Sequence, residues 1–211
     1  MVQPIKSMNR RELVFLILKA LLAWLIWSFL AWYVGEWLLK ALFPLLKAVM
    51  MMMSPDISPS LKVISNAASK LDYSIQLEAL PLRPVYLNAN QYIPPWTELK
   101  SSATLMHALV PLVIELSILC VWPVQRASQR VLLVGLGLLM AVMVIIATLP
   151  AQLLGRLEMS FQNVALNGQH PRPVPWFVDW MVFCEMGGGW LLGIVSAWVC
   201  IQCQRAWLKS A

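Results

Sequence analysis

LVFLILKALLAWLIWSFLAWYV, residues 13–34, is a run of 22 residues with a single charged side chain, Lys19. About 20 predominantly apolar residues are enough to cross the ~30 Å hydrocarbon core of a bilayer. The whole chain has the same character, since 60% of its residues are hydrophobic, 12% are charged and its mean hydropathy is +0.70. Globular domains carry about 25% charged residues. The sequence therefore predicts an integral membrane protein.

Three further apolar windows follow, at about 103–122, 131–154 and 176–201. We therefore predict an all-α integral membrane protein with four transmembrane helices and a small β-containing extracytoplasmic insertion between the first two helices. Three regions are expected along the chain. They are a cytoplasmic tail, first helix and interfacial extension in 1–53, a small β-rich segment in 54–102, and helices two to four in 103–211 with an outer loop at 155–175.

Lysine and arginine are unevenly distributed between the connections. Cytoplasmic segments next to membrane helices carry an excess of these residues. We therefore expect both termini in the cytoplasm, the two long connections outside, and a location in a bacterial cytoplasmic membrane. The net charge of +6 is explained by this topology, and no nucleic-acid partner is expected, because no soluble segment shows a basic stripe with stacking aromatics. The basic residues of the two tails and the 123–130 connection are Lys6, Arg10, Arg11, Arg126, Arg130, Arg205 and Lys209, opposed by Glu12.

The segment GEWLLKALFPLLKAVMMMM, residues 35–53, has two interpretations. The favoured one is a first helix that continues outward or bends at Gly35 or Pro44 to lie in the outer interface. The alternative is a short fifth span. Lys40 and Lys47 disfavour that alternative, because lysines in the middle of a span are costly.

The segment that follows changes from helical to strand-like patterning. DYSIQLEAL, residues 72–80, alternates apolar and polar side chains, which is typical of a half-buried strand. LKVIS at 61–65 and PVYLNANQY at 84–92 are predicted as neighbouring strands, separated by turn-forming residues. About fifty residues with three short strands bury little core alone, so we expect this segment to pack on the membrane surface or on a partner.

The stretch CEMGGGW, residues 184–190, places a carboxylate beside three glycines within the fourth apolar window. On a continuous helix, Glu185, Gly189, Gly193 and Ala197 share one face. Small residues at four-residue spacing allow two membrane helices to approach closely. We therefore predict a helix-packing seam formed by Gly189, Gly193 and Ala197, with Glu185 as a polar contact at its end.

Four polar residues within the predicted spans are candidate functional residues: His107, Glu115, Asp179 and Glu185. Intramembrane ionisable groups are functional candidates by default. Counted from the outer ends of their spans, Glu115 and Glu185 are expected about 13–18 Å deep, so the two carboxylates could share one layer. Three roles remain open for them: polar contacts between helices, a proton or ion path, and contacts to a partner protein.

The remaining chemical signals in the sequence are weak. Cys200 and Cys203 form a single C-x-x-C without a second pair or a nearby histidine, so all four cysteines are predicted to be packing residues. A cysteine peptidase with Cys184 and His107 is a distant third class, because no second basic group is placed at the depth of Cys184. We expect no metal, no cofactor and no catalytic residue, and an enzyme is not the favoured class.

Two classes of function remain. The first is a non-catalytic membrane subunit or assembly factor of a cell-envelope complex, which contacts the lipid bilayer and a membrane or envelope protein partner through the seam and the outer β-rich segment. The second is a small transporter or proton-conducting component that uses Glu115 and Glu185. The outer segment should be indispensable in the first class and the two acids in the second.

Overall fold

The computed structural model describes residues 10–65, 73–87, 91–124, 126–167 and 172–210. Most of these residues are helical, and a small part forms strands. The helices are α1 (Arg10–Met53), α2 (Leu105–Val121), α3 (Ala127–Asn167), α4 (Trp176–Phe183) and α5 (Gly189–Ser210), with a π-helical turn η1 (Cys184–Gly188) between the last two. The strands are β1 (Ile57–Ser65), β2 (Tyr73–Pro81), β3 (Val85–Tyr86), β4 (Tyr92–Ile93) and β5 (Leu99–Thr104).

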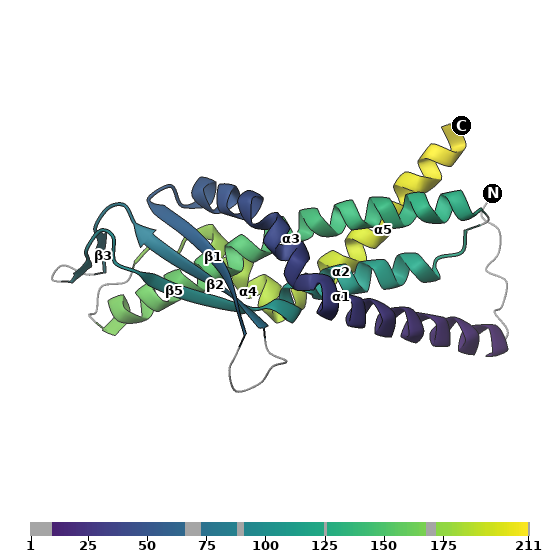
Figure 1. Ribbon diagram of the computed structural model, residues 1–211, viewed down its shortest axis with the longest axis horizontal. Helices are drawn as coiled ribbons and strands as arrows, with labels where there is room; N and C mark the ends of the chain where they lie inside the picture. Colours follow the sequence, from purple (N-terminus) through teal and green to yellow (C-terminus); the bar gives the residue numbers. More distant parts are fainter. Residues whose placement is uncertain (1–9, 66–72, 88–90, 125, 168–171, 211) are drawn as a thin grey trace.

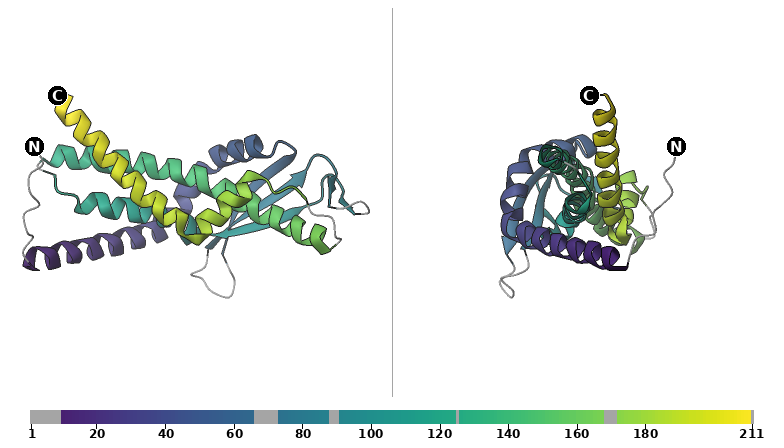
Figure 2. Two further views of the ribbon diagram at one scale, coloured as in Figure 1. Left: turned by 180° about the vertical axis from the view of Figure 1, so that it is seen from behind. Right: turned by 90° about the vertical axis from the view of Figure 1, so that its right-hand side faces the viewer.

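The molecule is elongated and has two parts (Figure 1). At one end the N-terminal part of α1, α2, the first part of α3 and α5 form a helical bundle, and both ends of the chain lie there (Figure 2). At the other end lie the strands, together with the last turns of α1 and α3. We call this second part the outer unit.

Three helical segments are long and apolar enough to cross a membrane: Arg10–Met53, Ala127–Asn167 and Trp176–Trp207. The shorter apolar helix α2 has 17 residues and is about 26 Å long. The chain is thus an integral membrane protein by helix length and composition. The coarse prediction of a mainly helical membrane protein with a small sheet is confirmed, and the fourth crossing, by α2, remains a prediction.

Helix α1 is assigned as one helix of 44 residues through Pro44, about 66 Å along its axis. The axis is bent, so the second half of α1 turns across the molecule and does not run straight on from the first half (Figures 1 and 2). Leu39, Leu46 and Met50 are fully buried on one face of its second half, which packs against the outer unit. Lys40 lies on the exposed side and pairs with Glu36 at 2.7 Å. The segment 35–53 is thus the outward continuation of the first helix.

Helix α3 is also longer than its apolar window, and this corrects the predicted outer loop. Residues 155–167, expected in the loop 155–175, continue the helix that begins at Ala127. The reason is an apolar stripe at four-residue spacing, Leu157, Phe161 and Ala165, which is buried. Because the sequence prediction ended the helix where high hydropathy ended, it missed this amphipathic extension into the outer unit.

The larger sheet is antiparallel and has the strand order β1–β2–β5. The predicted strand at 61–65 is confirmed as part of β1, and the described part of the predicted strand at 72–80, residues 73–80, is confirmed as part of β2; residue 72 lies outside the described residues. The prediction of a strand at 84–92 is wrong, because that segment contributes to the short β3–β4 hairpin and β5 supplies the third strand. Strand β5 was missed because its small polar residues, LKSSAT, carry little strand signal.

The two faces of this sheet are chemically different. One face is apolar and packs against α1, α2 and α3, through residues that include Leu61, Ile75, Leu77, Ala79 and Ala103. On the other face Lys62 pairs with Glu78 at 2.6 Å, and the Glu78 carboxylate raises the pKa of Lys62 by a hydrogen bond. Lys100 stands opposite Glu78 in the register. A charged, ion-paired face is typical of a sheet that faces water on one side, which favours a position outside the membrane.

Candidate functional site

The stretch CEMGGGW does not form one continuous α-helix. Residues Cys184–Gly188, which we call the π-turn, form a kink between α4 and α5, because Gly187 has φ +106°, a non-helical conformation that favours glycine. Because the turn interrupts the regular four-residue spacing, Glu185 does not continue the face formed by Gly189 and Gly193. The expectation that the acid and the seam share one stripe is therefore wrong.

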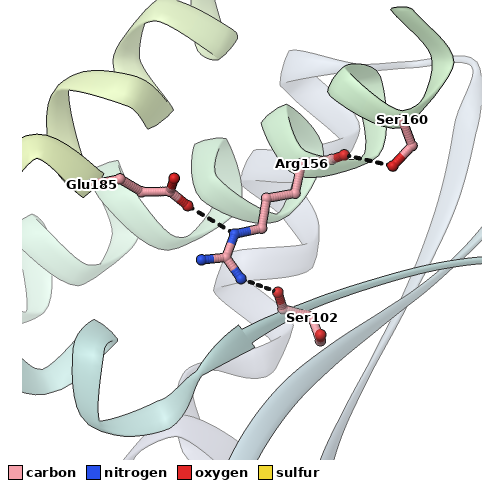
Figure 3. Close-up of polar contacts among 4 residues, drawn as sticks. All are labelled: Ser102, Arg156, Ser160 and Glu185. Atoms are coloured by element: carbon pink, nitrogen blue, oxygen red, sulfur yellow. Dashed lines mark hydrogen bonds and ion pairs between the residues drawn. The ribbon is translucent and has the colours of Figure 1, made fainter. Parts of the chain in front are cut away.

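Glu185 instead lies beside Arg156 of α3 (Figure 3). The Arg156 Nε group donates a hydrogen bond of 2.8 Å to Glu185 Oε1, and its Nη1 group donates one of 2.5 Å to the carbonyl oxygen of Ser102 in β5. Charge-assisted hydrogen bonds of this kind are stronger than neutral ones. One guanidinium thus joins the π-turn, α3 and the sheet where the bundle meets the outer unit. We call this site the Arg156 junction.

Helix α4 packs closely along α3 next to this junction. A Cβ atom built on Gly155 would lie 2.8 Å from Met181 Cβ, so glycine permits the close approach of the two helices. The indole Nε1 of Trp180 donates a 3.0 Å hydrogen bond to the Ala147 carbonyl, in the turn that precedes Pro150. These contacts hold α4 against the middle of α3.

Glu115 occupies a different site, inside the helical bundle. Its side chain is fully buried in α2, and the Cys200 thiol of α5 donates a hydrogen bond of 3.6 Å to Glu115 Oε1. A Cβ atom built on Gly137 of α3 would lie 3.7 Å from the same oxygen. In the described part of the chain, Glu115 Oε2 has no hydrogen-bond partner. The carboxyl group is thus enclosed by α2, α3 and α5.

Glu115 and Glu185 do not share a layer. Glu115 contacts Cys200, which lies 11 residues beyond Gly189 along α5, or about 17 Å by helical rise. Glu185 lies before Gly189, at the Arg156 junction. The sequence prediction placed them together because it treated residues 176–201 as a straight span and counted depth from its start.

The other two polar candidates lie near helix starts. His107 is half-buried in the first turn of α2. Asp179 is exposed in the first turn of α4, where an acidic side chain interacts favourably with the helix dipole.

The small residues of α5 face α2. A Cβ atom built on Gly193 would lie 2.7 Å from the Pro111 carbonyl oxygen and 3.1 Å from Pro111 Cα. One built on Gly189 would lie 3.7 Å from Pro111 Cγ. Ala197 is fully buried, in a cluster that includes Leu119 and Cys200. Gly193 thus packs directly against the backbone of α2 at Pro111.

Sequence reasoning missed Arg156 and a second arginine, Arg172. Arg172 Nε lies 3.3 Å from Glu158 Oε1, its Nη1 donates a hydrogen bond to the Tyr86 carbonyl, and its guanidinium lies 5.7 Å from the Phe161 ring centroid. Arg172 thereby attaches the β3–β4 hairpin to the end of α3. A signal for Arg156 was present in the sequence, since it directly follows the third apolar window.

The β3–β4 hairpin lies at the end of the molecule opposite the helical bundle (Figure 1), and it carries exposed aromatic side chains. Tyr86 and Tyr92 are paired across the hairpin with ring centroids 6.1 Å apart, and they are 67% and 59% exposed. Trp96 is 67% exposed and has φ +64°, which is uncommon for a residue other than glycine. We call Tyr86, Tyr92 and Trp96 the aromatic tip.

Within the described residues, no group of three or more His, Cys, Asp or Glu side chains is arranged to hold a metal ion. Comparison of the chain with protein families, with curated proteins and with solved structures finds no match.

Proposed function

We propose that this protein is a non-catalytic membrane subunit or assembly factor of a cell-envelope complex. In this proposal four transmembrane helices anchor the outer unit, and the outer unit contacts a membrane or envelope protein partner. The bacterial cytoplasmic membrane is the proposed location, with both termini in the cytoplasm. The support is the basic residues next to the start of α1, the start of α3 and the end of α5, which meet at one end of the bundle: Arg10, Arg11, Arg126, Arg130 and Arg205.

The exposed aromatic tip is the observation that carries this proposal. Tyrosine and tryptophan are enriched at the centres of protein interfaces, where they supply much of the binding energy. In Tyr86, Tyr92 and Trp96, more than half of each side chain is exposed, in a part of the molecule far from the helical bundle. Lipid therefore does not account for their exposure.

The attachment of the tip supports the same function. The Tyr86 carbonyl accepts a hydrogen bond from Arg172, and Arg172 is itself paired with Glu158 of α3. A surface held by buried and paired groups loses little conformational freedom on binding. The long α3 would thus present the tip at a fixed height above the membrane.

The size of the native complex tests this proposal. The protein, extracted from its own membrane in a mild detergent, should sediment as an assembly larger than the detergent-bound chain alone. The Tyr86→Ser, Tyr92→Ser, Trp96→Gly variant should sediment as the free chain, because the contact residues are lost.

The matched control is Lys62→Ser with Lys100→Ser on the polar sheet face, which should leave the assembly intact. Thermal unfolding of both variants checks that the fold is retained. A wild-type protein that sediments alone, or a folded tip variant that stays in the assembly, would contradict the proposed partner surface.

A second candidate function, proton conduction, is supported by the enclosed carboxyl group of Glu115. Because Glu185 lies apart from Glu115, at the Arg156 junction, Glu115 alone is the proposed proton carrier. Proton flux into liposomes that contain the purified protein tests it, with Glu115→Gln as the variant and Asp179→Asn as the control. A flux abolished by Glu115→Gln alone would favour conduction, whereas no flux above empty liposomes would exclude it.

A further inference from the structure

A groove of about 670 Å³ lies between the first turns of α1 and the ends of α2 and α3 that face them. It is at the same end of the bundle as the two chain termini. Apolar side chains form most of its wall, and Lys19 and Arg130 are its cationic residues, opposed by Glu12. The apolar lining includes Phe15, Leu16, Leu22, Ile26, Val121 and Val124.

We propose that this groove binds an anionic phospholipid of the leaflet that faces the chain termini. In this arrangement the phosphate lies between Lys19 and Arg130, and an acyl chain lies along the apolar wall. Basic pockets between transmembrane helices recognise anionic headgroups in this way. The proposal is independent of the partner surface at the other end of the molecule.

The conformation of Lys19 supports a headgroup contact. Its Nζ lies 4.5 Å from the centroid of the Phe15 ring, one turn closer to the start of α1. The side chain therefore runs towards the end of the helix, as expected of a lysine that keeps its charge at the membrane interface. This direction of the side chain brings the Lys19 ammonium group towards the depth of the lipid phosphates, although its Cα lies within the apolar span.

Arg130 provides the second cationic group from a fixed position. Its Nη1 donates hydrogen bonds of 3.0 Å to the Leu119 carbonyl and 2.6 Å to the Cys120 carbonyl. These bonds satisfy carbonyl oxygens at the end of α2, which have no partner in their own helix. Both bonds use one nitrogen, so in the described part of the chain Nε and Nη2 remain available to a phosphate oxygen.

A contact between α1 and α2 lies next to the groove. The Trp27 indole donates a hydrogen bond of 3.2 Å to Cys120 Sγ, and Cys120 lines the groove. The apolar 18-residue window of α1 buries none of its residues in the protein. Lipid is the available material to fill the space between this part of α1 and the bundle.

Native mass spectrometry of the full chain in detergent tests the proposal, with dioleoylphosphatidylglycerol and dioleoylphosphatidylcholine as probes. Wild-type protein should retain phosphatidylglycerol in preference to phosphatidylcholine. Lys19→Gln should weaken phosphatidylglycerol binding about fivefold, since each basic residue near the membrane surface contributes about that factor. The matched control is Arg205→Gln, which removes a charge that lies 5.1 Å from the Trp122 ring at the same end but outside the groove.

A second variant tests the acyl-chain contact separately from charge. Ala23→Phe places a larger side chain on the groove wall, keeps both cations, and should reduce phosphatidylglycerol retention. Equal retention of the two lipids by the wild type would overturn the proposal. So would equal losses in Lys19→Gln and Arg205→Gln, or unchanged binding in a folded Ala23→Phe variant, because these results indicate general surface attraction.

Discussion

Arg156 Nε lies 2.8 Å from Glu185 Oε1. This ion pair joins α3 to the π-turn that precedes α5. The same guanidinium donates a hydrogen bond to the Ser102 carbonyl in β5. The last transmembrane segment, α3 and the sheet therefore meet at one side chain. We expect this junction to stabilise the contact between the outer unit and the bundle, in addition to the continuous helices α1 and α3.

Arg156→Met should destabilise the protein more than Glu185→Gln. Arg156→Met removes both the ion pair with Glu185 and the hydrogen bond to the Ser102 carbonyl, whereas Glu185→Gln affects only the ion pair. That pair contributes about 0–1 kcal/mol, because both of its side chains are more than one-third exposed. Thermal unfolding in detergent measures both variants, with Glu36→Gln, in the Lys40 pair on α1, as the control. Equal losses in Arg156→Met and Glu36→Gln would show that Arg156 is an ordinary surface residue.

Gly193→Ala should destabilise the packing of α5 on α2 by about 1–3 kcal/mol, the usual cost of overpacking. The added Cβ would lie 2.7 Å from the Pro111 carbonyl oxygen, a backbone atom with little freedom to move. Gly135→Ala is the matched control, because a Cβ at this helical glycine meets no atom within 4 Å. The close-packing account does not survive if both variants unfold at the same temperature.

Gly187→Ala tests the π-turn by a different mechanism. No atom lies within 4 Å of a Cβ at this position, so the substitution adds no steric contact. Its φ of +106° is unfavourable for alanine, and left-handed conformations cost L-residues about 1–2 kcal/mol. We expect a lower unfolding temperature than for Gly135→Ala, and an unchanged temperature would mean that the turn relaxes without cost.

The sequence predicted those parts of the fold that follow from local patterns. The first helix was evident from the apolar run at 13–34, and the alternation at 72–80 identified β2. Strand β5 and the end of α3 were not predicted, because small polar residues and an amphipathic stripe depend on neighbours distant in sequence.

The candidate site shows the same limit more clearly. A Cβ at Gly189 or at Gly193 would lie near Pro111 of α2, but the four-residue spacing did not reveal the π-turn at Gly187 that precedes them. The change of chain direction at the π-turn places Glu185 beside Arg156 of α3. Residue spacing along one helix cannot predict this contact, because Arg156 belongs to another helix. The partner of a polar residue is determined by tertiary structure.

The membrane topology can be measured by cysteine accessibility. On a cysteine-free background, Ser58→Cys in β1 should react with an impermeant maleimide in intact cells, because the sheet lies at the outer end. Ser128→Cys at the start of α3 should react only after permeabilisation. Labelling of both positions from the same side would refute an arrangement in which the bundle separates them.

Site-specific photo-crosslinking in intact membranes tests the central claim, a partner contact at the aromatic tip, most directly. With p-benzoylphenylalanine at Tyr92, the account predicts a discrete crosslinked product between this chain and a second protein. With the same probe at Gln76, on the polar face of the sheet, it predicts none. A product at position 76 but not at position 92, or no product at either position, would contradict the account.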